Sequence, residues 1–306
     1  MLIKGLRDGA KSKEVQNRAE IIVEVAEKKM SKAKRETSEA IEKLGKEKLE
    51  AYRTEVKEFV DTFSKLRNFE FNDKFVMESS DLGISELQIR EMKEISLTAE
   101  DTLKGVVTGV GAGVLVGWGT YGGVMALGTA STGTAIASLS GVAAKNATLA
   151  WLGGGSLAVG GGGIAVGSLV LGGLVAGPVL LIAGGIIGAK ATESLNNAKA
   201  NLSVAKKLDS DVNAAVKETE VICQKVDQVM KIIKVLRKDA SIANENLKRL
   251  VRQKDDWRQY SDTEKKTTFA IFKTVQILKE VVEIPLLTED GVLTKEINEI
   301  QKYAQV

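Results

Sequence analysis

Apolar residues recur at alternating steps of three and four along the first part of the chain. The regular positions are Leu49, Tyr52, Val56, Phe59, Phe63 and Leu66, extended more weakly by Ile22, Ala26, Ala33, Ala40 and Leu44. This period of about 3.5 residues is typical of a helix that packs lengthwise against another helix. Because the stretch lacks proline and contains one glycine, Gly45, we predict a single helix from Ser12 to Leu66.

A second stripe with the same period lies in the C-terminal part of the chain. Its members are Leu195, Ala198, Leu202, Ala205, Val212, Ala215, Ile222, Val226, Val229, Ile233, Leu236, Ala240, Ala243, Leu247 and Leu250. It predicts a helix from Ala191 to Gln253. Asp209 and Thr219 interrupt the stripe, which leaves two interpretations open, a polar pair that sets the register or a water-filled seam.

Shorter helices are predicted from local start and stop signals. Helix-start spacing occurs at Ser85 with Gln88, at Thr98 with Asp101, and at Ser261 with Glu264. The helix after Ser261 should run to about Glu283, because Ile284-Pro285 ends it. Residues 67–84 are predicted as a turn region, and residues 294–303 as a short last helix.

Between the two stripes lies a segment almost without charge. Residues 105–189 contain one charged side chain, Lys145, and 25 of the 30 glycines. Residues 105–127 and 164–189 are uncharged runs, and residues 128–163 are rich in Thr, Ser, Ala and Gly. About 20 apolar residues suffice to cross a bilayer core of about 30 Å. The two outer runs therefore predict a transmembrane-capable helical hairpin.

Glycines in the outer runs repeat at helical spacing. In the first run they are Gly105, Gly109, Gly113 and Gly117. Just before the second run stands Gly163, and within it are Gly167, Gly173, Gly177, Gly184 and Gly188. Glycines four residues apart on one helix face allow two helices to approach backbone to backbone, as in membrane helix pairs. We therefore predict that these residues pack helices together.

Four other residues of the segment are candidates for a role in the membrane. Trp118 and Trp151 are candidates for interfacial anchors or for ordinary apolar packing. Lys145 is a candidate for a tip or pore-lining residue carried across a membrane, or for an exposed loop lysine. Pro178 is expected to kink the second run.

Composition argues against most chemical functions. The net charge is only +3 and both signs are mixed in the flanks, so nucleic acid is not an expected partner. The chain lacks histidine and has one cysteine, Cys223, which we interpret as a core or seam thiol. Residues 117–122 match G-x-G-x-x-G without the strand and acidic residue of a dinucleotide site. We expect no catalytic, cofactor-binding or metal-binding residues and no small-molecule substrate.

These elements predict an all-α fold, a long antiparallel helical bundle or coiled-coil stalk that carries a glycine-rich apolar hairpin. Residues 1–104 and 190–306 form its arms, and residues 105–189 the membrane-inserting segment. The plan, two long stripes around an apolar segment, resembles α-helical pore-forming toxins of the cytolysin A and haemolysin BL type. Glycine-rich residues 149–163 are also similar to stretches in apolipoprotein-L-like and interferon-inducible membrane proteins.

The toxin resemblance implies a soluble form that hides the hairpin, then insertion and oligomerisation. The expected partners are a lipid bilayer and further copies or related helical subunits. The expected location is a membrane, permanently or after a soluble stage, and the N-terminal residues show no secretory signal. The alternatives are a permanently membrane-embedded coiled-coil scaffold that binds partners and, third, an enzyme using Asp or Glu.

Overall fold

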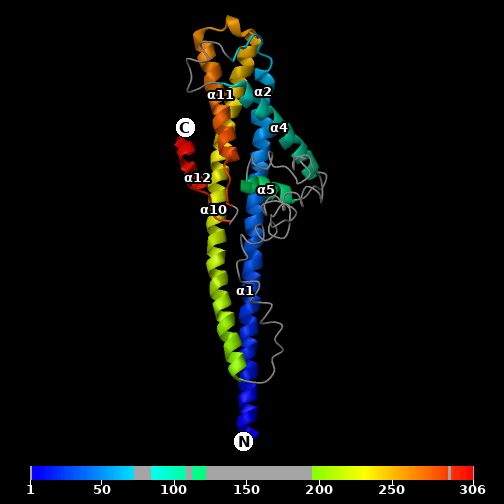
Figure 1. The fold of residues 1–306 in the computed structure, drawn as a ribbon, viewed down its shortest axis with the longest axis vertical. Coiled ribbons are helices and arrows are strands. Elements are labelled where there is room, and N and C mark those ends of the chain that lie inside the picture. The colour runs from blue at the N-terminus through cyan, green and yellow to red at the C-terminus, as the bar shows by residue number, and fades with distance from the viewer. Residues whose placement is uncertain (1, 72–83, 108–111, 122–194, 289–290, 306) are drawn as a thin grey trace, which may run out of the picture. The chain divides into compact units, whose positions relative to one another are not determined.

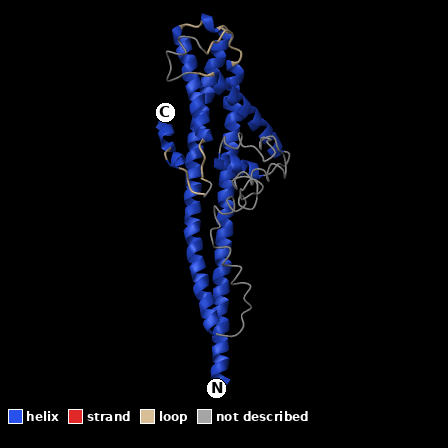
Figure 2. Cartoon of the chain, viewed as in Figure 1, coloured by secondary structure: helices blue, strands red, loops and turns tan. Residues whose placement is uncertain are grey.

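The described part of the chain is mostly helical. A computed structural model describes residues 2–71, 84–107, 112–121, 195–288 and 291–305. These residues form helices joined by short loops and contain no strand (Figures 1 and 2), which confirms the predicted all-α fold. The chain divides into two compact units. Unit 1 comprises Met1–Glu39 and Ser168–Gln224, and unit 2 comprises Ala40–Gly167 and Lys225–Val306.

Two long helices contribute residues to both units. The first consists of α1 (Leu2–Ala51), a π-helical turn η1 (Tyr52–Val56) and α2 (Lys57–Phe63) in direct succession. The second is α10 (Leu195–Gln253), which ends at the predicted residue. The first helix begins ten residues earlier than predicted, at Leu2 in place of Ser12. Its first turns include Gly5 and Gly9, whose low helix propensity gives no sequence signal for this earlier start.

In unit 1, α1 and α10 pack through small side chains at the stripe positions. The buried residues are Ala19, Val23, Ala26 and Met30 of α1, and Ala205, Leu208 and Val212 of α10. Alanines in such a seam let two helix backbones approach closely, so little volume separates them. Stripe residues Leu202 and Ala215 are half-buried at the edge of this core.

The two long helices run parallel, so the predicted antiparallel arrangement is wrong. In unit 1, Asn201 donates to Gln16, Asp209 pairs with Lys29, and Cys223 contacts Thr37. The residue numbers of the contacting pairs therefore increase in the same direction along both helices. The same holds in unit 2, where Glu47 pairs with Arg237 and Glu58 with Lys248. A heptad stripe specifies that a helix has a lengthwise partner and leaves the direction of that partner undetermined.

The two polar interruptions of the α10 stripe have different roles. Asp209 is half-buried beside Leu208 and accepts from Lys29 Nζ at 3.0 Å, across the helix pair. Thr219 is buried, and its hydroxyl donates to the Val216 carbonyl of its own helix at 2.8 Å. Asp209 thus links the two helices in register, whereas Thr219 satisfies its polar group locally.

Unit 2 adds the shorter helices. They are α4 (Glu86–Val107), α5 (Ala112–Tyr121), α11 (Asp262–Glu283), α12 (Lys295–Asn298) and the 3-10 turns η5 (Trp257–Gln259) and η6 (Ile300–Gln305). The capping boxes predicted at Ser85 and Ser261 are present, with Gln88 and Glu264 as their reciprocal partners. The predicted last helix is divided between α12 and η6.

The helix start predicted at Thr98 is wrong, because α4 continues through it. Met92, Ile95, Ala99 and Leu103 are buried on one face of α4. An N-cap residue has non-helical backbone angles, which would break that face in its middle. Burial of the continuous apolar face therefore outweighs the local capping signal.

The charge-free segment is described only near its start. Gly105 belongs to α4, and Gly113, Gly117 and Trp118 belong to α5. The other predicted packing residues lie outside the described residues: Gly109, Lys145, Trp151, Gly163, Gly167, Gly173, Gly177, Pro178, Gly184 and Gly188. Within the described ranges, no helix combines the length and the apolar character that a membrane crossing requires.

Candidate functional site

Helix α5 lies near the start of segment 105–189, and it is packed into unit 2. Its residues Leu115, Val116, Trp118 and Thr120 are buried. Trp118 is 1% exposed and meets the ring of Tyr52 edge-on, with centroids 6.0 Å apart and planes at 66°. Trp118 therefore occupies a packing position, with its ring enclosed by protein.

The closest approach between α5 and α1 is a crossing of two glycines. A Cβ atom added at Gly45 would overlap the carbonyl group of Leu115 and would lie 2.7 Å from the backbone nitrogen of Gly119. A Cβ added at Gly119 would overlap the carbonyl of Ile41. Both positions thus require glycine, because any side chain would separate the two backbones.

The segment after α11 holds α5 at its other end. The backbone amide of Leu286 donates to the Thr120 carbonyl at 2.6 Å. Residues 284–287 are fixed in turn by Thr294, the N-cap of α12, whose hydroxyl donates to the Pro285 carbonyl at 2.6 Å. The last turn of α5 is therefore bonded to a segment that the start of α12 orders.

Lys48 lies on the face of α1 that α5 covers. Ile41, Gly45, Lys48 and Tyr52 follow one another at steps of four, three and four, so they share one side of the helix. Helix α5 contacts this side at Ile41, Gly45 and Tyr52. Lys48 is 0% exposed, and its ammonium donates to the Ile284 carbonyl at 2.8 Å. A lysine is thus enclosed among α1, α5 and residues 284–287.

The groups around Lys48 compensate its charge only in part. Glu283 lies close, but its oxygens accept from Tyr52 at 2.7 Å and from Lys279 at 2.8 Å. Burial lowers the pKa of Lys48 to about 7, and the charge of Glu283 opposes that shift. Burial, followed by Glu283, raises the pKa of Tyr52 well above 10.0. The site therefore favours a neutral amine and a neutral phenol.

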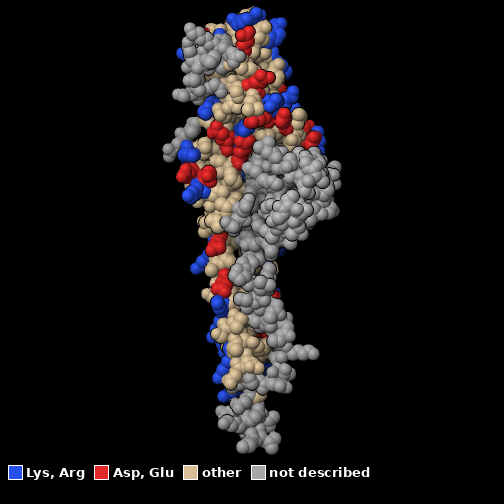
Figure 3. All heavy atoms as spheres, viewed as in Figure 1, with Lys and Arg blue, Asp and Glu red and all other residues tan. Residues whose placement is uncertain are grey.

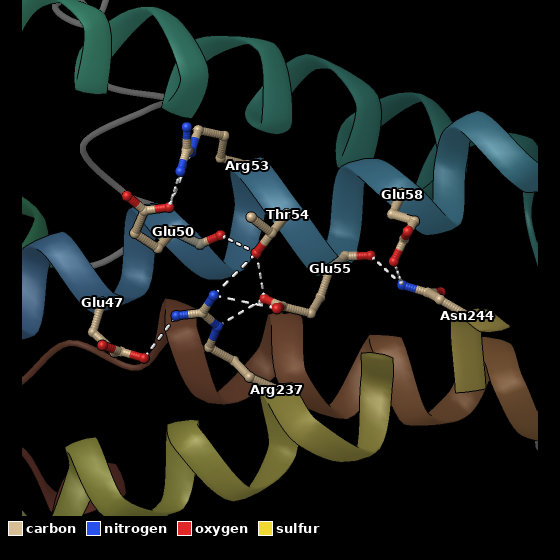
Figure 4. A network of polar contacts seen from close by, with 8 residues as sticks. All are labelled: Glu47, Glu50, Arg53, Thr54, Glu55, Glu58, Arg237 and Asn244. Atoms are coloured by element: carbon tan, nitrogen blue, oxygen red, sulfur yellow. Dashed lines mark hydrogen bonds and ion pairs between the residues drawn. The ribbon is translucent and has the colours of Figure 1, made fainter. Parts of the chain in front are cut away.

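A polar network joins η1 to α10 in unit 2 (Figure 4). The guanidinium of Arg237 donates from Nε to Glu55 at 2.7 Å, from Nη1 to Glu47 at 2.7 Å, and from Nη2 to the Thr54 hydroxyl at 3.1 Å. Burial by itself lowers the pKa of Arg237, but the bonds and charges of Glu55 and then Glu47 outweigh burial and raise it. The fork geometry of arginine allows one side chain to bind both carboxylates.

The same network fixes the π-helical turn. Thr54 Oγ1 lies 2.6 Å from both the Glu50 carbonyl and Glu55 Oε2. Asn244 is fully buried and donates to the Glu55 carbonyl at 2.8 Å, while its own Oδ1 has no partner among the described residues. A π turn inserts one residue and changes which side chains face the partner helix. Here it aligns Glu47 and Glu55 on Arg237.

Charged side chains of both signs also line a cavity of unit 2. A cavity of about 750 Å³ is lined by Glu42, Lys46, Glu50, Arg53, Thr54, Lys57, Glu100, Leu103, Lys104 and Leu115. Its charged groups include two ion pairs, Arg53 with Glu50 at 2.6 Å and Lys104 with Glu100 at 2.8 Å. Figure 3 likewise shows both signs on the described surface. In the described ranges no three acidic or cysteine side chains are placed to hold a metal ion.

Comparison with known proteins finds no family model, no curated protein and no solved structure that matches this chain. Of the predicted packing residues, Trp118 contacts the site and Gly117 is buried in the same helix, while the glycine that meets α1 is Gly119. Gly45 and Lys48 were missed as site residues. Gly45 has a signal in the sequence, since it is the one glycine between Ser12 and Leu66, whereas Lys48 has none among the many lysines of this stretch.

Proposed function

We propose that this chain is a non-enzymatic protein that inserts residues 105–189 into a lipid bilayer, self-associates there and forms a pore, as toxins of the cytolysin A type do. One observation carries the proposal: 85 consecutive residues with one charge cannot be a solvated surface, and they stand between two charged helices. The proposed inserting element is a helical hairpin of residues 105–127 and 164–189.

The packing of α5 supports a stage before insertion. Leu115, Val116 and Trp118 are sheltered within unit 2, and the glycine crossing at Gly45 permits this without interlocked side chains. An inserting protein needs such a sheltered state, because exposed apolar surface in water promotes aggregation. The Arg237 network and the aromatic contact of Phe59 with Phe272 stabilise the helices around it.

Dye release from liposomes tests the proposal. The full chain is added to vesicles of phosphatidylcholine with and without anionic lipid, and leakage is followed by fluorescence. We expect Val175→Asp to abolish leakage, because a charge at the centre of a crossing helix costs about 3 kcal/mol. Val235→Asp is the matched control on an exposed position of α10, and it should leave leakage unchanged.

Sedimentation without detergent distinguishes the sheltered protein from a permanently embedded scaffold. A switchable protein stays in solution and releases dye, whereas a scaffold sediments until detergent is added. A chain that is soluble but inert on every vesicle composition would refute membrane insertion. Equal leakage with V175D and the wild type would refute the assignment of residues 164–189 as a crossing helix.

A further inference from the structure

Lys48 is the one buried lysine of the described residues, and it lies on the face of α1 that α5 contacts. The other described lysines keep part of their side chain in water; the least exposed of those in ion pairs are Lys279 at 16% and Lys248 at 26%. On α1, Gly45 and Tyr52 flank Lys48 on the same face, and both contact α5. Removing α5 would therefore uncover the face that carries the amine.

The closure over Lys48 is made by two elements that are bonded to each other. Leu286 of the 284–287 segment donates to Thr120 of α5, and the Ile284 carbonyl accepts from Lys48. The described residues of α5 bring no aspartate, glutamate, lysine or arginine. The charged or titratable groups near the amine are Glu283 and Lys279 of α11, Tyr52 of α1, and Glu91 of α4 through its effect on Tyr52.

We propose that Lys48 sets how tightly α5 is docked: its enclosed amine weakens docking, and release of α5 returns the amine to water. This proposal deepens, and rests on, the proposed function, since release of α5 would begin the release of the charge-free segment. An apolar residue at position 48 would make docking tighter than the inserting step requires. A buried amine keeps the free-energy difference between the docked and the released state small.

Protonation of Lys48 makes the docking of α5 depend on pH. The docked amine has a pKa of about 7, and the released amine has the ordinary lysine value of 10.5. Between these two values the released state binds more protons, so docking strengthens by up to about tenfold for each unit that pH rises. Below pH 7 both states are protonated, and the docking constant should be flat. Above about pH 10 Tyr52 begins to contribute, so measurements stay below pH 9.5.

Cysteine labelling of the full chain measures docking directly. Cys223 is replaced by Ser, and Leu115, which is buried in α5, by Cys. The rate of reaction with a maleimide is compared with that of the same reporter in Gly119→Val, where a side chain would overlap the Ile41 carbonyl and hold α5 undocked. The ratio of the two rates at each pH gives the protection that docking provides, with thiol ionisation cancelled.

We expect Lys48→Met to raise protection at pH 7.5 by at least about tenfold, with an upper limit of about a thousandfold set by the difference between the released pKa of 10.5 and that pH. Wild-type protection should rise from pH 7 to pH 9.5, and K48M protection should not. Lys43→Met, at an exposed lysine of the same helix, should behave as the wild type. Protection that is unchanged or reduced in K48M, or flat with pH in the wild type, would overturn the proposal.

Dye release separates this proposal from the function on which it rests. K48M should slow leakage relative to the wild type by about the factor by which it raises protection. If the wild type causes no leakage but protection depends on Lys48 as described, membrane insertion fails and the docking role stands. If the wild type and K48M leak at the same rate while protection differs, docking does not control insertion.

Discussion

Removing the Arg237 side chain should destabilise unit 2 more than removing any exposed ion pair. Arg237→Met preserves the apolar stem and deletes a cation that binds Glu47 and Glu55. The side chains of Glu47 and Glu55 are 18% and 12% exposed, and the side chain of Arg237 is 21% exposed. Breaking a fully buried pair costs about 3–5 kcal/mol. Since about a fifth of the network is solvated, we expect a loss of about 2–3 kcal/mol.

Urea unfolding followed by circular dichroism measures this loss. Arg90→Met is the matched control: Arg90 of α4 lies 4.0 Å from Glu94, and both side chains are about two-thirds exposed. It should cost at most about 0.5 kcal/mol. The double variant R237M/E55M should recover part of the loss, because one carboxylate no longer lacks its partner. If R237M costs no more than R90M, the network contributes nothing beyond a surface pair and our interpretation fails.

Two further predictions concern local features. Ser261→Ala should cost about 1 kcal/mol in thermal unfolding, because the Ser261 hydroxyl caps the Glu264 amide of α11. Hydrogen bonds from the Ser261 amide and then from Lys254 lower the pKa of Glu264 to about 2. The stabilisation that ionised Glu264 contributes is therefore complete above pH 4.5 and is lost as the pH falls toward 2. Glu264→Gln should remove this part of the acid dependence of the melting temperature. In unit 1, Ala205→Leu should cost about 1–3 kcal/mol by overpacking the seam, whereas Lys206→Leu, on the exposed face, should change stability little; equal melting temperatures would mean that the seam tolerates extra volume.

Helix boundaries were predictable where short-range chemistry decides them. Ser261 and Glu264 lie within one turn, and Ile284-Pro285 ends α11 by local sterics, so both limits of that helix follow from adjacent residues. The stripes likewise identified buried positions such as Leu44, Phe59 and Val226, because burial of one helix face imposes the period.

Features that depend on the partner helix were not predictable in this way. The parallel direction of α1 and α10 is one such feature. The connection between the two helices is long enough to allow either direction, so its length gives no prediction. The π turn at Tyr52–Val56 lies beside Arg237, a residue far along the chain that binds both Glu47 and Glu55. Lys48 resembles any surface lysine until α5 and residues 284–287 cover it.

The crossing of Gly45 and Gly119 has a mechanical consequence. Where two bare backbones touch, the contact offers precise fit but little adhesive area, because dispersion attraction grows with the number of touching atoms. Two helices in such a contact must fit closely, yet they can separate without moving one set of side chains past another. The barrier to separation is then set by the neighbouring contacts, the Trp118 and Tyr52 rings and the hydrogen bond from Leu286 to Thr120, which can break one after the other.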